Sequence, residues 1–361
     1  MGNANGKGGK DASAQIEKKM QEAAVDAANN HSLLLLGAGE SGKSTLLRQM
    51  RHIWGKQFLV RERQNYQKIM WENVTESIQI LCQQSIQLSQ NNNIKDCEID
   101  EKNREHVEFA LKLNKMDLPI FDEKIYECFE TIWNDKGVKN TLLHRDKYYI
   151  LDSAEYFLNN MKKYIGDDYV PTFDEICHSR VRTTGIKKEV FLFNKVLFTV
   201  FDIGGQRSER RKWLTVCDNV KAVIYVCSLA GYNQVIFEDN KSNRLIEAWS
   251  VYDKYVNHVS FKKINVILFL NKCDLFDVMI KTIPFTQCPV EDYKDGANDK
   301  DAVIKYIIKQ FQKRTVGFDT GSRSIYPHIT CATNTENVKA VFSAVRHIVI
   351  KSHLQESAIL K

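Results

Sequence analysis

The sequence contains no C-x-x-C pair, and none of its nine cysteines precedes Cys82. An odd number of scattered cysteines without metal-ligand spacing excludes a disulfide-stapled scaffold and indicates no zinc site. The chain also lacks a secretory signal, because residues 1–6 are polar. The aliphatic stretch at 33–36 is far shorter than the about 20 residues that a membrane-spanning helix needs. We therefore expect a cytosolic protein with reduced thiols.

The sequence also lacks a large excess of one charge. It has 51 Lys and Arg against 45 Asp and Glu, and the net charge of +6 is spread along the chain. So mild an excess favours contact with an anionic membrane surface and gives little support for a nucleic-acid partner, which we do not expect. The 361 residues, 43% of them hydrophobic, suffice for two domains of ordinary size with buried cores.

Glycine and proline are absent between residues 56 and 118. Apolar residues such as Ile69, Ile78 and Leu81 recur there among polar ones, and the pattern stays mostly helical as far as Gly166. Residues 62–172 are therefore predicted to form a separate all-helical domain.

The rest of the chain alternates between short β-rich runs and helical segments. The predicted strands are 32–36, 190–193, 196–201, 222–226, 266–270 and 325–330. Asn194-Lys195 is predicted to join the second and third of them in a hairpin. Helices are predicted from Lys43 to His52 and, with an apolar stripe, over 337–350. This alternation predicts an α/β fold in which a mostly parallel sheet carries helices on both faces.

Residues 11–30 read as one polar, alanine-rich helix. Its apolar positions, Ile16, Met20, Ala23 and Ala27, form a stripe too narrow to bury much surface. Either this helix frays in solution or it docks on a partner, and the pattern alone leaves both open.

The segment Gly37-Ala38-Gly39-Glu40-Ser41-Gly42-Lys43-Ser44 matches G-x-x-x-x-G-K-[ST] and lies between a predicted strand and a predicted helix. Glycines let backbone N–H groups turn toward phosphates, and the following helix directs the positive end of its dipole at them. In this motif Lys43 reaches the β- and γ-phosphates and the Ser44 hydroxyl binds Mg²⁺. The pattern predicts a phosphate-binding loop, which in isolation is also compatible with a plain connecting turn.

The segment Asp202-Ile203-Gly204-Gly205-Gln206 follows the predicted strand 196–201. An aspartate at the carboxyl end of a strand lies where a doubly wound sheet binds its ligand, and it can hold Mg²⁺ through water. We expect the Gly205 N–H to meet the γ-phosphate and Gln206 to orient the attacking water. Without a phosphate-binding loop the same residues would indicate only a tight turn.

Two further motifs, each at a predicted strand end, match a guanine base. Asn271-Lys272-Cys273-Asp274 offers a carboxylate that accepts from the N1–H and the exocyclic amine of guanine, donors that adenine lacks on that edge. Thr330-Cys331-Ala332-Thr333 places the Ala332 N–H where it could meet the guanine O6. Each motif alone is weak, but the ordered set of four predicts a GTPase.

Lys43 and Asp202 are much further apart in sequence than a minimal GTPase requires, because the helical block 62–172 lies between them. With the segments around Leu151-Asp152-Ser153 and Arg180-Val181-Arg182-Thr183-Thr184, these motifs resemble the α subunits of heterotrimeric G proteins over essentially the whole chain. The resemblance implies a Ras-like P-loop GTPase domain at 32–61 and 173–361, the inserted helical domain at 62–172, and a partner- and membrane-facing N-terminal helix at 1–31.

The resemblance also implies roles for individual residues. Arg180 resembles the built-in arginine of the family, which together with Gln206 would be catalytic, and Thr183 would join Ser44 as a Mg²⁺ ligand. Residues 178–187 and 204–217 would be switch segments. The nucleotide-binding set comprises Gly37, Glu40, Ser41, Gly42, Lys43, Ser44, Thr45, Ser153, Cys177, His178, Ser179, Arg180, Thr183, Asp202, Gly205, Asn271, Lys272, Asp274, Leu275, Cys331, Ala332 and Thr333.

The implied cofactors are GTP or GDP and Mg²⁺. The implied partners are a βγ dimer, a seven-helix receptor engaged by 347–361, downstream effectors, and regulators of GTP hydrolysis. The implied location is the cytoplasmic face of the plasma membrane, with a cytosolic pool. Gly2 is available for myristoylation, but Asn3 stands where many members carry a palmitoylated Cys, so we expect weak, reversible attachment.

Two other positions depart from the family. Ala358 stands where one subclass has a toxin-modified Cys, and Cys177 stands where Leu is usual.

Two rival functions are a scaffold that binds GTP without hydrolysing it, and a P-loop kinase or ATPase. The presence of Gln206 and Arg180 argues against the first, and Asn271-Lys272-x-Asp274 argues against the second.

Overall fold

The computed structural model describes residues 30–91, 93–114, 120–217, 220–262, 264–321 and 323–359, the last nine by their backbone only. The predicted helix at 11–30 lies outside the described residues except for Asn30, which begins the first strand. Gly2 and Asn3 lie outside them too, and so does the side chain of Ala358.

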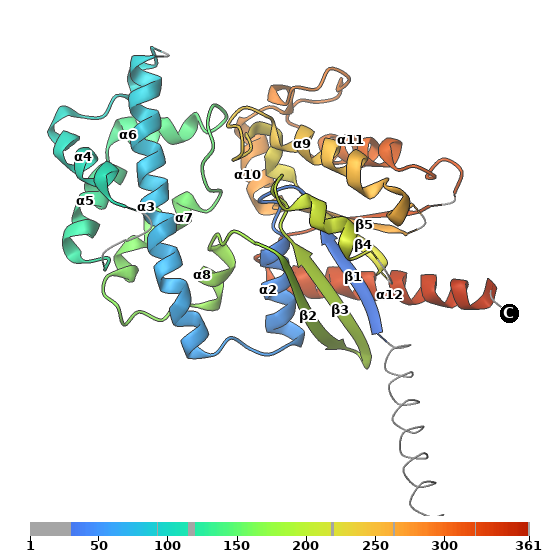
Figure 1. Ribbon diagram of the computed structural model, residues 1–361. Helices are drawn as coiled ribbons and strands as arrows, with labels where there is room; N and C mark the ends of the chain where they lie inside the picture. Colours follow the sequence, from blue (N-terminus) through green and yellow to red (C-terminus); the bar gives the residue numbers. More distant parts are fainter. Residues whose placement is uncertain are drawn as a thin grey trace, which may run out of the picture.

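Six strands form one sheet in the described part of the chain, in the order β2-β3-β1-β4-β5-β6 (Figure 1). Their bounds are β1 (Asn30–Leu36), β2 (Ile186–Phe193), β3 (Val196–Ile203), β4 (Val220–Ser228), β5 (Val266–Asn271) and β6 (Ile325–Ile329). All neighbours pair in parallel except β2, which runs antiparallel to β3 at the edge. The predicted hairpin is confirmed: Asn194 and Lys195 both adopt positive φ, at 48° and 63°, as a two-residue type I′ turn requires.

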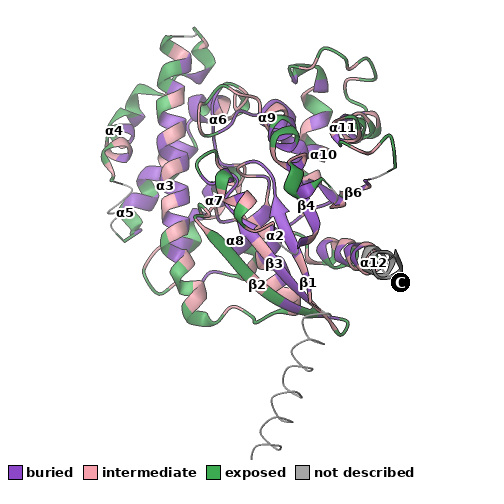
Figure 2. Ribbon diagram, turned by 45° about the vertical axis from the view of Figure 1, so that its right-hand side comes forward, coloured by how far each residue is buried: buried purple, intermediate pink, exposed green. Residues whose placement is uncertain are grey.

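The leucines of β1 explain why this strand lies in the centre. Leu33, Leu34, Leu35 and Leu36 are all completely buried, because alternate side chains of a strand point to opposite faces and here both faces are covered. Leu33 and Leu35 pack in the cluster with α2 (Lys43–Trp54) and α12 (Thr335–Ile359). Leu34 and Leu36 pack on the other face. Figure 2 shows the contrast between these buried central strands and the exposed edge strand β2.

The opposite face of the sheet is covered by three helices, α9 (Arg244–Val251), α10 (Cys273–Thr282) and α11 (Lys300–Arg314). The predicted apolar stripe of α12 is confirmed, since Val338, Phe342, Val345 and Val349 are each at most 2% exposed. The fold class is therefore a Ras-like α/β domain with helices on both faces of a mostly parallel sheet.

A second hydrophobic core lies in the helical block between α2 and β2. Its helices are α3 (Val60–Gln90), α4 (Arg104–Lys112), α5 (Glu123–Trp133), α6 (Lys136–Leu143) and α7 (Ala154–Asn160), followed by α8 (Phe173–His178). Met70, Val74, Ile78 and Leu81 line one face of α3 and are completely buried. This is the inserted all-helical domain; its limits at 62 and 172 stay a prediction.

Short helical turns fill several of the connections. They are Lys95–Cys97, Glu101–Asn103, Met161–Tyr164, Arg210–Thr215, Leu229–Asn233, Tyr252–Val256, Val259–Phe261 and Phe285–Gln287. The loops that matter for function leave the carboxyl ends of β1, β3, β5 and β6. Because these strands are parallel, their carboxyl ends meet at one edge of the sheet, where Leu35 of β1 pairs with Asp202 of β3.

Candidate functional site

The loop between β1 and α2 is held open as a cradle by backbone conformations that favour glycine. Gly37 and Gly42 adopt φ of 143° and 102°, and Glu40 adopts 60°. A Cβ on Gly42 would lie 2.1 Å from the amide nitrogen of Asn271, and a Cβ on Gly37 would lie 2.2 Å from the Val226 carbonyl oxygen. Only glycine fits at positions 37 and 42, because other parts of the chain lie too close to leave room for a side chain. This explains the glycines of the sequence motif.

Lys43 lies beneath this loop and is 5% exposed. Its Nζ donates hydrogen bonds to the carbonyl oxygens of Gly37 and Ala38, both at 2.9 Å. Burial lowers the pKa of the Lys43 ammonium to about 8. The structure thus places the predicted phosphate-binding cation inside the cradle, held by the loop's own carbonyl groups.

Three oxygen-bearing side chains meet at the first turn of α2. The Ser44 hydroxyl lies 2.6 Å from the Thr183 hydroxyl and donates to Asp202 Oδ2 at 2.8 Å. Asp202 Oδ1 is buried without a hydrogen-bond partner in the described residues. Burial raises the pKa of the Asp202 carboxyl, an effect opposed by the Lys43 ammonium. This group of hydroxyl and carboxylate oxygens brings together residues 158 positions apart.

The loop after β3 packs directly against the cradle. A Cβ on Gly205 would lie 2.4 Å from both Lys43 Nζ and the Gly37 carbonyl oxygen, so a side chain is excluded there. Gln206 follows, and its Oε1 is buried without a hydrogen-bond partner in the described residues. Arg210, further along the same loop, fixes its position: the Arg210 guanidinium donates to the Gly205 carbonyl at 2.9 Å and to Glu247 at 2.8 Å.

Asn271 ties the loops after β5 and β6 to the cradle. Its amide donates to the Ser41 carbonyl at 2.8 Å, and its Oδ1 accepts from the Ala332 N–H at 3.0 Å. Lys272 adopts φ of 61° and turns the chain into α10, which places Asp274 in the first turn of that helix. The Asn271 side chain therefore serves the architecture of the site, joining three strand-end loops.

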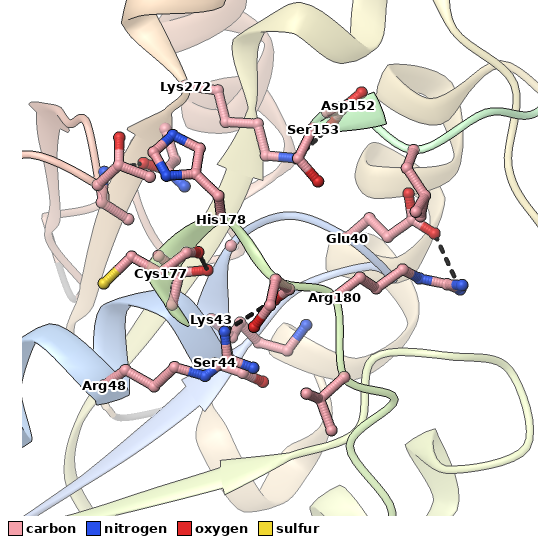
Figure 3. Close-up of a pocket in the computed structure, with 18 of the residues that line it drawn as sticks. Glu40, Lys43, Ser44, Arg48, Asp152, Ser153, Cys177, His178, Arg180 and Lys272 are labelled. Carbon is pink, nitrogen blue, oxygen red and sulfur yellow. Dashed lines mark hydrogen bonds and ion pairs between the residues drawn. The ribbon is translucent and has the colours of Figure 1, made fainter. Parts of the chain in front are cut away.

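These elements enclose a cleft of about 470 Å³, a size typical of small-molecule sites (Figure 3). Most predicted nucleotide-binding residues line it: Glu40, Gly42, Lys43, Ser44, Thr45, Ser153, Cys177, His178, Ser179, Arg180, Thr183, Gly205, Asn271, Lys272, Asp274, Leu275, Ala332 and Thr333. Gln206, predicted to be catalytic, lines it too. Gly37, Ser41, Asp202 and Cys331 do not line it but hydrogen-bond to residues that do.

Residues that the motifs did not single out help to close the cleft, from the helical domain and from the Ras-like domain. Tyr156 of α7 stacks on the His178 ring, with centroids 4.0 Å apart and planes 6° apart. The Tyr156 hydroxyl donates to Asp174 at 2.7 Å. Arg48 of α2 donates to the carbonyl oxygens of Ile176 and Ser179, both at 2.8 Å. No pattern in the sequence predicts these contacts, because each contact joins residues from different elements of the chain.

Asp152 connects the two domains across the cleft. It is ion-paired with Lys272 (Figure 3), and also with Arg244 at 3.0 Å and with Arg145 at 3.3 Å. Burial alone would raise the pKa of this carboxyl, but the Lys272 and Arg244 cations outweigh it and hold the pKa well below its usual range. Asp152 belongs to one of the segments that resemble the family, but nothing in the sequence identified Arg244 as its partner.

Replacing Asp152 with Asn is expected to accelerate nucleotide release about 10-fold, because it leaves Lys272 and Arg244 without their shared anion in the closed arrangement. The release rate of a fluorescent GDP analogue would measure this. Asp146→Asn is a matched control, since Asp146 lies in the same segment and pairs with the neighbouring Lys147, at 3.7 Å, on its own side of the cleft. Equal release rates for wild type and Asp152→Asn would show that the cross-cleft ion pairs do not retain the nucleotide.

Arg180 lines the cleft, and its side chain is 19% exposed. Its guanidinium pairs with Glu40 at 3.2 Å and with Glu76 at 3.7 Å. Its backbone is fixed by Asn73, whose side chain accepts from the Arg180 N–H at 2.7 Å. The cation is therefore held beside the cradle by one acidic residue from each domain.

Comparisons with known proteins agree with this geometry. The family model for the G-protein alpha subunit matches residues 10–349. The chain is 35% identical to the guanine nucleotide-binding protein G(o) subunit alpha of Locusta migratoria, over 95% of this chain and 94% of that protein. It is 36% identical to the guanine nucleotide-binding protein alpha-16 subunit of Caenorhabditis elegans, with the same shares of each chain covered. The chain belongs to the family of G-protein alpha subunits, the GTP-hydrolysing signalling switches of heterotrimeric G proteins.

Proposed function

We propose that the cleft binds GTP together with Mg²⁺ and that Gln206 and Arg180 carry the hydrolysis. The observation on which this rests is the chain of oxygens from Thr183 through Ser44 to Asp202, directly beside the buried Lys43 ammonium. A cation and a set of hard oxygen donors at the amino end of a helix are what a magnesium triphosphate requires.

The side chains at this point fit Mg²⁺ in number and chemistry. Ser44 and Thr183 offer neutral hydroxyl oxygens, and the free Oδ1 of Asp202 offers a charged acceptor for a metal-bound water. In the part of the chain that the structure describes, no cluster of three or more His, Cys, Asp or Glu residues forms an all-protein metal cage. When bound, Mg²⁺ would neutralise the charge on the β- and γ-phosphates.

The remaining roles follow from position. Lys43 holds the phosphates as a point charge, and the Gly205 N–H faces the γ-phosphate end of the cradle. Gln206 presents its unpartnered Oε1 as the acceptor that orients the attacking water. Arg180 stabilises the charge that develops on the phosphates. At the other end, Asp274 and the Ala332 N–H recognise guanine.

The switch acts through the two loops that meet at the cradle. Residues 178–187 contain Thr183, and residues 204–217 contain Gly205 and Gln206, so both loops line the cleft. Both would contact the γ-phosphate there. Loss of the γ-phosphate removes contacts that favour one arrangement of these loops. The second loop is also joined to α9 by the ion pair between Arg210 and Glu247. A change in the position of this loop would therefore move α9 as well.

Members of this family work with βγ dimers, receptors and effectors. We propose that residues 1–31 and the second switch engage a βγ dimer, and that the end of α12 engages a seven-helix receptor. No helix in the described part of the chain combines the length and apolar character needed to cross a membrane. We propose attachment to the cytoplasmic face of the plasma membrane through an acylated Gly2, with a cytosolic pool.

Single-turnover hydrolysis of preloaded radiolabelled GTP tests this proposal. Gln206→Leu keeps a side chain of similar size but removes the acceptor, so the rate of phosphate release should fall about 100-fold. GTP affinity should stay close to that of wild type, because Gln206 binds no ground-state phosphate. Tight binding without phosphate release by either protein would favour a GTP-dependent scaffold instead.

A further inference from the structure

Two aromatic rings flank the Arg180 guanidinium. The Cζ atom of Arg180 lies 5.0 Å from the centroid of the Phe237 ring and 5.5 Å from that of Tyr149. The two rings contact each other nearly at right angles, with centroids 5.1 Å apart. Tyr149 precedes α7 in the helical domain, whereas Phe237 belongs to the loop between β4 and α9. Neither residue lies in any of the nucleotide-binding motifs.

The rings are themselves fixed to the site. Tyr149 is 6% exposed, and its hydroxyl donates to Glu40 Oε1 at 2.5 Å, the oxygen that also pairs with Arg180. The Tyr149 N–H donates to the side chain of Asn240, in the same loop as Phe237. Figure 3 shows Glu40 and Arg180 directed at each other beside the cradle. The Glu40 carboxylate and the two ring faces therefore hold the guanidinium from several sides.

We propose that Tyr149 and Phe237 are positioning residues that hold the Arg180 guanidinium at the phosphate end of the cleft. The inference rests on the proposed catalytic role of Arg180. A free arginine side chain samples many rotamers, and ordering it only in the transition state lowers the rate by about 10-fold. Aromatic faces attract a guanidinium and restrict its plane without occupying its N–H groups.

Phe237 allows a clean test, because it is 43% exposed and its replacement leaves both hydrophobic cores intact. Phe237→Leu keeps an apolar side chain but removes the aromatic face, and single-turnover GTP hydrolysis should slow about 3- to 10-fold. Phe237→Tyr keeps the face and should hydrolyse GTP within about 2-fold of the wild-type rate. Phe318→Leu is the control for the loss of a phenylalanine ring, since Phe318 lies in the loop before β6 and packs against the core beneath α11, whereas Phe237 packs against Arg180.

A double-mutant cycle with Arg180→Ala separates positioning from a general structural effect. If Phe237 acts through Arg180, adding Phe237→Leu to Arg180→Ala should change the hydrolysis rate no further. Wild-type hydrolysis by Phe237→Leu would overturn the inference, and so would an equal slowing in both backgrounds. An Arg180→Ala protein that hydrolyses GTP normally would overturn the proposed role of Arg180 and the inference with it. A slow Arg180→Ala protein beside a normal Phe237→Leu protein would overturn the inference alone.

Discussion

Replacing Lys43 with Ala is expected to weaken the binding of GTP about 1,000-fold. The ammonium is buried under the loop and would make charge-assisted hydrogen bonds to two phosphates, each worth about 2 kcal/mol. Together these correspond to about 4 kcal/mol, or about three orders of magnitude in the dissociation constant. Equilibrium titration with a fluorescent GTP analogue would measure the change.

Lys43 also donates to the Gly37 and Ala38 carbonyl groups, so its removal can loosen the loop as well as remove the charge. Lys43→Gln separates the two effects, because it retains an N–H donor and lacks the charge. We expect both variants to bind equally weakly. Lys339→Ala controls for the loss of a lysine, since Lys339 pairs with Glu336 on the exposed side of α12. A folded Lys43→Gln protein that binds GTP within about 3-fold of wild type would contradict the assigned role.

The parts of the fold that the sequence predicted are those determined by local patterns. A run of four leucines between polar residues indicates a strand buried on both faces, and β1 is such a strand. The positive φ values of Asn194 and Lys195 confirm the hairpin expected there. Each motif was expected at a strand end, and the parallel pairing of β1, β3, β5 and β6 then brings the motifs to one edge. Neither inference needs knowledge of distant contacts.

The ends of helices and strands were predicted less accurately, because they depend on packing against the rest of the fold. The strand expected at 222–226 is β4 (Val220–Ser228), since its ends are also buried between neighbouring strands. The helix expected at 337–350 is α12 (Thr335–Ile359), which continues past the last apolar position that packs on the sheet. The apolar pattern indicates which part of a helix is buried. It does not indicate how far the helix continues beyond the sheet on which it packs.

Cross-domain contacts could not be predicted from this sequence. Asp152 meets Arg244 at a separation of 92 residues, and Tyr149 meets Asn240 at a separation of 91. Charged and aromatic residues are common throughout the chain, and which of them pair depends on how the helical domain docks on the sheet. The motifs therefore identify residues that would touch the nucleotide, whereas the residues that close the cleft and flank Arg180 emerge only from the structure.

Replacing Asp274 with Asn is expected to exchange the preferred base from guanine to xanthine. The Asp274 carboxylate would accept from two guanine donors, and an amide in its place leaves one of these facing another N–H group. Xanthine carries a carbonyl where guanine carries the exocyclic amine, so the amide can donate to it. We expect the ratio of GTP to XTP affinity to fall about 1,000-fold, measured by competition against a labelled nucleotide.

The position of Asp274 makes this a local change. It is exposed in the first turn of α10 and lines the cleft, so no core contact is lost. Asp277→Asn, one turn further along α10, is the matched control, because Asp277 pairs with Lys300 at 2.7 Å and does not line the cleft. ATP should compete poorly with every variant, since adenine lacks both donors. Equal competition by ATP and GTP at the wild-type site would place the chain's base recognition outside Asp274 and revive an ATP-dependent function.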